Sequence, residues 1–140
     1  MSEHLIVRVV SKMLIPFILL FALYVQMHGD YGPGGGFQAG VIFATAFIIY
    51  AIVFGAKRAI RVLPLSVLTA MVSLGLVLYA MVGFVSLAAG GIFLDYGALD
   101  SHDPVHGQHL GIIIIELGVG ITVAGVLTAI FYTFAERWQK

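Results

Sequence analysis

The sequence predicts an all-α membrane protein with four transmembrane helices and with both ends of the chain in the cytoplasm. Its 140 residues are 61% hydrophobic and only 10% charged, with a mean hydropathy of +1.07. Globular domains carry about 25% charged residues. Four apolar stretches are each long enough to cross a bilayer, which takes roughly 20 residues. The lysines and arginines fall only in alternate connections between these stretches, as expected for an even number of crossings.

The whole chain, residues 1–140, is expected to form one transmembrane domain with spans at about residues 6–27, 37–55, 65–89 and 110–134. The connections between the spans are polar or rich in glycine and proline, which interrupt helices. The first span is too long for a signal peptide and no small-residue cleavage site follows it, so we expect an uncleaved anchor. Pro16 is expected to kink this span.

The basic residues set the expected orientation. All seven lie at the two ends of the chain or between the second and third spans: Arg8, Lys12, Lys57, Arg58, Arg61, Arg137 and Lys140. The positive-inside rule places these segments in the cytoplasm. Lys12 lies within the first span and is expected to extend its ammonium group to the cytoplasmic surface.

Small residues recur at helical spacing and predict close packing between the spans, because helices in lipid associate through close contact of small side chains. The predicted faces are Gly40, Ala44, Ala51 and Gly55 in the second span; Ser66, Ala70, Ser73 and Ala80 in the third; and Gly111, Gly118, Thr122, Gly125 and Ala129 in the fourth.

Glu116 is the one acidic residue well inside a predicted span, about 10 Å from the start of the fourth span at ~1.5 Å per residue. It lies nearly opposite the small face that contains Gly118, so both faces of this span should contact protein or water. Four short helices can hardly surround one of their own number, which predicts packing against other subunits. An intramembrane carboxylate is a candidate for ion or proton transfer, and the alternative is a hydrogen-bonded carboxyl that holds two helices together.

The run Pro33-Gly34-Gly35-Gly36-Phe37 opens the second span. Consecutive glycines permit backbone conformations closed to other residues and let another chain approach closely. The start of a helix can bind anions, but no Lys-Ser/Thr pair follows, so this is not a phosphate-binding P-loop. We expect a re-entrant turn packed against a neighbour.

The connection before the fourth span is rich in acidic and imidazole side chains: Asp100, His102, Asp103, His106 and His109. The three histidines have i, i+4, i+7 spacing, but Pro104 and Gly107 argue against a helix across all of them. With no cysteine and no His-Glu-x-x-His, no metal site is predicted. The connection is either a surface that collects protons or cations, or an exposed loop without such a role. The formal net charge of zero gives no indication of nucleic acid binding.

The run from Met27 to Gly40 resembles the signature of the B subunit of Mrp-type multisubunit sodium/proton antiporters. That family has the pattern Gly-His-x-x-Pro-Gly-Gly-Gly-Phe-x-x-Gly between its first two helices. Here Asp30 stands where the family usually has histidine, so a titratable role at this position changes from a base to an acid. The family also has an acidic residue followed by Gly-Val early in its last helix, which resembles Glu116-Leu117-Gly118-Val119.

The resemblance implies a small membrane subunit of a cation (Na⁺)/proton antiporter in the bacterial inner membrane, a transporter component rather than an enzyme, without a cofactor. Its implied partners are the lipid bilayer, large subunits similar to the antiporter-like subunits of respiratory complex I, and other small membrane subunits. Its role would be in assembly and in the ion path. Candidates for the ion or proton pathway are His28, Asp30, His109 and Glu116; candidates for the packing motif are Pro33, Gly34, Gly35, Gly36, Phe37, Gly40 and Gly118.

Two other functions remain open at this stage. The chain could be the equivalent subunit of a membrane-bound hydrogenase-like respiratory complex, since related subunits occur there. It could also be a stand-alone channel made of several copies of one chain.

Overall fold

The computed structural model describes residues 3–29, 32, 34–100 and 102–137. Within these ranges every regular secondary-structure element is a helix. The elements in chain order are α1 (Glu3–Met27), α2 (Gly36–Phe54), α3 (Ala56–Val62), α4 (Leu65–Ala88), the 3₁₀ helix η1 (Tyr96–Leu99) and α5 (Pro104–Arg137). In the described part of the chain, four of these helices are long and apolar enough to cross a membrane: α1, α2, α4 and α5. The predicted all-α fold with four transmembrane helices is therefore confirmed.

The start of α5 differs from the expectation. The helix begins at Pro104 rather than near residue 110, and it runs through Gly107. A proline is tolerated in the first turn of a helix because its missing N–H would have no partner there. Asp103 caps the same turn, since its Oδ1 accepts hydrogen bonds from the backbone N–H groups of Val105 (3.0 Å) and His106 (3.2 Å). No helix covers all three histidines, as expected, because α5 begins after His102; Gly107 nevertheless lies inside the helix.

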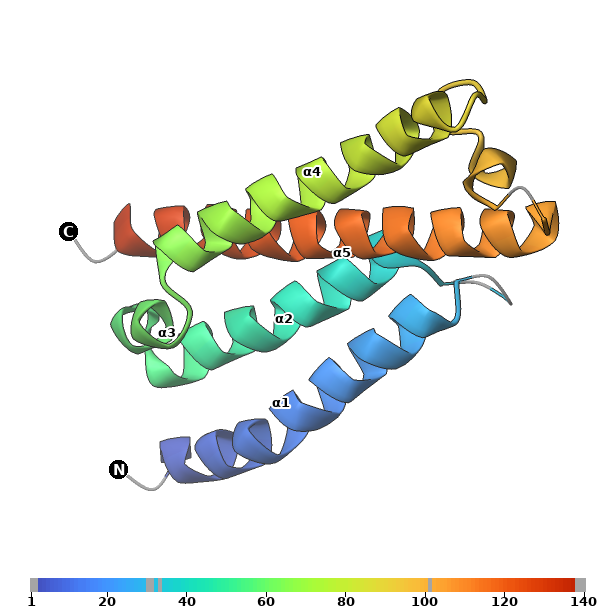
Figure 1. Cartoon of the computed structure of the whole chain (residues 1–140). Coiled ribbons are helices and arrows are strands. Elements are labelled where there is room, and N and C mark those ends of the chain that lie inside the picture. The colour runs from blue at the N-terminus through green and yellow to red at the C-terminus, as the bar shows by residue number, and fades with distance from the viewer. Residues whose placement is uncertain (1–2, 30–31, 33, 101, 138–140) are drawn as a thin grey trace.

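The helices are arranged around α5, which lies between α2 and α4, while α1 packs on α2 (Figure 1). Both chain ends and α3 lie at one end of the bundle, which we call the terminal end. The α1–α2 connection and η1 lie at the other end, which we call the turn end. The argument that the last span could not be covered on both faces by its own chain is therefore wrong, because α2 and α4 cover it.

Glycines bring both neighbours close to α5. A Cβ built on Gly118 would lie 2.8 Å from the carbonyl oxygen of Gly75 in α4, and one built on Gly40 in α2 would lie 2.6 Å from the carbonyl oxygen of Gly120. These are shorter than contacts that real Cβ atoms make. The small faces predicted for the second and fourth spans thus do pack, on opposite sides of α5, except at Gly55, which has nothing within 4 Å of its Cβ position.

The face predicted for the third span is wrong. Ser66, Ala70 and Ser73 are exposed, and α4 instead buries Leu68, Gly75, Val82, Gly83 and Ser86. A serine needs no neighbouring helix at this depth, because its hydroxyl can donate to the carbonyl one turn earlier. Ser73 does so, with its Oγ 3.0 Å from the oxygen of Thr69.

The terminal end is an apolar cluster with a basic rim. Ala51, Ala59, Leu68 and Tyr132 are buried against one another. The basic residues of α3 are exposed: Lys57, Arg58 and Arg61. Lys12 extends toward the same end, with its Nζ 6.0 Å from the centroid of the Phe54 ring.

Candidate functional site

Glu116 is half-buried on α5 and faces the α1–α2 connection. A Cβ built on Gly35 would lie 2.7 Å from Oε1 of Glu116, and one built on Gly29 would overlap both carboxylate oxygens. A Cβ on Gly36 would overlap the backbone carbonyl of the same residue. The backbone of the connection therefore lies directly on the carboxylate, and three glycines make the room for it.

Gly35 is also required for its backbone conformation. It has φ 115° and ψ −178°, a region that is essentially restricted to glycine. The connection is closed by two hydrogen bonds to the carbonyl oxygen of Val25, donated by the backbone N–H groups of His28 and Gly35, each 3.3 Å. We call residues 28–36 the glycine turn; it turns the chain from α1 into α2 at this point.

The start of α2 also lies beside the Glu116 side chain. Gly35 is the N-cap of α2 and provides no side-chain cap for the first turn of that helix. The first N–H groups of a helix carry partial positive charge and attract anions. The group of this protein that lies beside the helix start is the carboxyl group of Glu116.

His28 lies beside this contact. Its ring stacks on Tyr24 of α1, with centroids 5.2 Å apart and planes 18° from parallel. A Cβ on Gly32 would lie 3.2 Å from its Nε2, so the imidazole lies against the glycine turn. The other candidates within the turn, Asp30 and Pro33, lie outside the described residues.

His109 is exposed on α5, seven residues before Glu116. Seven residues are close to two helical turns, so both side chains project from the same face, about 10 Å apart along the axis.

The remaining residues of the predicted packing motif differ in role. Gly40 and Gly118 are packing positions on opposite sides of α5, whereas Phe37 is 60% exposed.

The connection before α5 forms its own polar cluster at the turn end. Asp100 Oδ1 accepts hydrogen bonds from the backbone N–H groups of His102 (3.0 Å) and Asp103 (3.3 Å), and its Oδ2 lies 3.0 Å from Nδ1 of His106. The hydrogen bond to the His106 ring, followed by the two backbone bonds, lowers the pKa of Asp100 below its ordinary value. Within the described ranges, no three His, Cys, Asp or Glu residues are placed to hold a metal ion together.

The contact between the glycine turn and Glu116 was not predicted from the sequence, where the glycine run and the carboxyl group were interpreted as separate features. Both were expected toward the same side of the membrane, and this shared depth is the feature of the sequence from which their contact could have been predicted. Gly29, which lies closest to the carboxylate, was not singled out at all.

Comparison with known proteins gives a consistent result along nearly the whole chain. The family described as "Domain related to MnhB subunit of Na+/H+ antiporter" matches residues 6–129. A protein of Staphylococcus haemolyticus (strain JCSC1435) is 33% identical over 131 residues, which cover 92% of each chain. One of Staphylococcus aureus (strain Newman) is 29% identical over 136 residues, which cover 96% of each chain. Both carry the name "Putative antiporter subunit mnhB2".

Proposed function

The chain belongs to the family of the MnhB subunit of Na⁺/H⁺ antiporters, and we propose that it is a small membrane subunit of a multisubunit Na⁺/H⁺ antiporter in the bacterial plasma membrane. The family resemblance seen in the sequence is thereby confirmed. The names of both relatives favour the antiporter over the hydrogenase-like complex and over the stand-alone channel. The partners would be the other antiporter subunits, both large and small.

Within this complex, we assign Glu116 as the group that binds the transported proton or cation in this subunit. The observation that supports this role is the packing of its carboxylate under the glycine turn. A carboxylate at membrane depth is costly unless it is surrounded by polar groups. The turn supplies main-chain groups and the start of α2 there, with His28 at its edge. A purely structural carboxyl would fit the same place, so ionisation has to be tested separately from packing.

The test replaces Glu116 in the co-expressed complex and measures Na⁺/H⁺ exchange in membrane vesicles. Glu116→Gln keeps size and hydrogen bonding but removes ionisation, and we expect it to assemble and to lose most of the exchange activity. Glu116→Asp should retain more activity than the glutamine variant. Asp95→Asn is the matched control, because it removes a carboxylate from the connection before α5, outside the four spans. Unchanged rate and pH dependence in Glu116→Gln would show that the carboxyl only holds helices together.

The proposed orientation places the terminal end in the cytoplasm, because the described basic side chains gather there: Arg8, Lys12, Lys57, Arg58 and Arg61. The sequence has no cysteine, so single cysteines can be introduced without background. An impermeant thiol reagent should label His102→Cys in intact cells, and should label Arg58→Cys only after the membrane is opened. Labelling of Arg58→Cys from outside would reverse the topology.

A further inference from the structure

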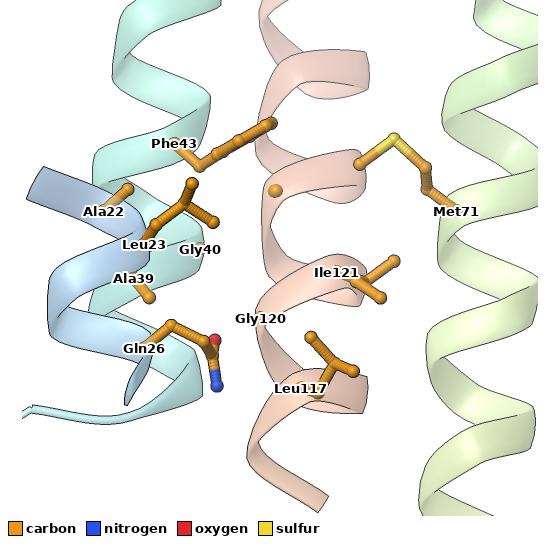
Figure 2. A pocket seen from close by; sticks show the side chains of 11 residues that line it. Ala22, Leu23, Gln26, Ala39, Gly40, Phe43, Met71, Leu117, Gly120 and Ile121 are labelled. Carbon is orange, nitrogen blue, oxygen red and sulfur yellow. The ribbon is translucent and has the colours of Figure 1, made fainter. Parts of the chain in front are cut away.

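A pocket of about 120 Å³ lies along α5 and is lined by residues of α1, α2, α4 and α5. Figure 2 shows this pocket, with α1 and α2 on one side, α4 on the other and α5 between them. Leu23 of α1 and Leu117 of α5 line it and are 56% and 43% exposed. Five small residues also line the pocket: Ala22, Ala39, Gly40, Gly120 and Ala124. Its lining is almost entirely apolar, as a surface that faces lipid would be.

Gln26 is the exception in this lining. Its amide points from α1 toward α5 (Figure 2), and a Cβ built on Gly120 would lie 2.5 Å from its Oε1. Gly120 lies ten residues beyond Leu110, where the apolar part of α5 begins, which is about 15 Å along the helix. The amide is thus placed deep in the bilayer, at the level of the middle of α5.

The amide of Gln26 makes no hydrogen bond with the part of the chain that the structure describes. Seven hydroxyls in the spans are paired within their own helix, because each donates to the carbonyl four residues earlier: Thr45, Thr69, Ser73, Ser86, Thr122, Thr128 and Thr133. An amide with two donors and one acceptor group needs partners from outside its helix.

We infer that this pocket receives a transmembrane helix of another antiporter subunit, which places a hydrogen-bonding side chain against Gln26 and a leucine-sized side chain against Gly40 and Gly120. Acyl chains could fill the volume, but they offer no donor or acceptor to the amide. Water needs two to four polar partners, and the lining offers it one polar side chain. Small residues in the lining let the incoming backbone approach closely. This inference rests on the proposed function, which supplies the other subunits.

The first test compares three variants in the complex co-expressed with the other antiporter subunits. Gln26→Leu should lower the yield of assembled complex about threefold to tenfold, the cost of one lost interhelical hydrogen bond. Gln26→Asn should keep most of the yield, since it retains the amide. Gln108→Leu is the matched control; Gln108 is an exposed amide that lies before the apolar part of α5 and does not line the pocket. It should assemble normally.

Different outcomes separate the occupants. If lipid fills the pocket, Gln26→Leu should assemble as well as the wild type or better, which would overturn the inference while leaving the proposed function intact. An equal loss in Gln108→Leu would also overturn it, because the effect would then follow from the loss of any amide and not from this pocket. If the wild-type chain forms no complex with antiporter subunits at all, the proposed function fails, and the inference fails with it.

The second test identifies the occupant directly. Benzoylphenylalanine at position 23 should cross-link, in the purified complex, to one membrane segment of a different subunit. Peptide mapping should find a serine, threonine, asparagine or glutamine within one helical turn of the cross-link. Adducts with phospholipid only, with a second copy of this chain, or with a segment that has no such side chain would each overturn the inference.

Discussion

The two ends of the bundle use the same central helix in opposite ways. At the turn end, α5 presents Glu116 to the glycine turn. At the terminal end, the same helix presents Tyr132 to a cluster of apolar side chains, with the basic residues of α3 outside it. Glycine at the turn end makes room for a carboxyl group, whereas the buried cluster at the terminal end holds no acidic or basic side chain. The terminal end thus packs the bundle with apolar side chains, and the role proposed for Glu116 would place the ion chemistry at the turn end.

The largest effect on the turn end is expected from a substitution of Gly35. Gly35→Val should abolish the glycine turn and with it the assembled complex, because a side chain would combine backbone strain of about 1–3 kcal/mol with overpacking of similar size. Yield of complex and Na⁺/H⁺ exchange measure the loss. Gly55→Val is the matched control, since Gly55 also has positive φ (96°) but nothing within 4 Å of its Cβ position. Equal losses in both variants would show that contact with the carboxylate adds nothing to the strain.

Gly29 tests the contact without an unusual backbone angle. Gly29→Ala should reduce assembly or exchange less than Gly35→Val, because its Cβ would meet only the end of the Glu116 side chain. Shortening that side chain with Glu116→Asp should partly restore the complex. The double variant would then be more stable than additivity predicts, by about 0.5–3 kcal/mol for residues in direct contact. If the changes in unfolding free energy of the two single variants add up to that of the double variant, Gly29 and Glu116 do not interact.

The number and identity of the spans could be predicted from the sequence, because a helix in lipid needs only length and apolar composition. Packing faces were harder. The third span carries small residues on two faces, and nothing in the pattern separates Ser73, which bonds its own helix, from Gly75, which touches Gly118. The position of α5 between two neighbours also escaped prediction, since periodicity gives the direction of a face and not the helix that covers it.

The start of α5 was predictable in principle. Asp103 followed by Pro104 is a common helix start, and the glycine at position 107 was given too much weight against it. That glycine lies where η1 crosses the helix, since a Cβ there would be 2.7 Å from the carbonyl oxygen of Tyr96. The close contact with η1, and not a turn, therefore explains why position 107 is a glycine.

Asp100 extends the comparison to the polar connection at the turn end. Because its pKa in the folded chain is lowered, its contribution to local stability is present above the ordinary pKa of aspartate and is lost as the pH falls through the lowered value. Asp100→Asn should therefore speed amide hydrogen exchange at His102 and Asp103 at neutral pH, where the wild-type carboxylate is ionised. Exchange at residues of the terminal end should not change. Unaltered exchange in the variant would mean that the hydrogen bonds of this carboxylate do not hold the connection.

Substitution of Tyr132 gives the smallest expected change in stability and tests whether the cluster at the terminal end is free of polar contacts. The residue is 2% exposed, and its hydroxyl has no hydrogen-bond partner among the residues that the structure describes. Removing an unpaired buried hydroxyl relieves a cost, so Tyr132→Phe should leave thermal stability unchanged or raise it by about 1 kcal/mol. The ring keeps its edge contact with Phe131, whose centroid is 6.4 Å away. Tyr132→Ala, which also removes the ring, should instead destabilise by about 3–5 kcal/mol, as other buried aromatics do. Both values can be read from unfolding of the purified complex in detergent. A clear loss of stability in Tyr132→Phe would mean that the hydroxyl is paired in the assembled complex. The terminal end would then hold a polar contact of its own, and the contrast between the two ends would be one of degree.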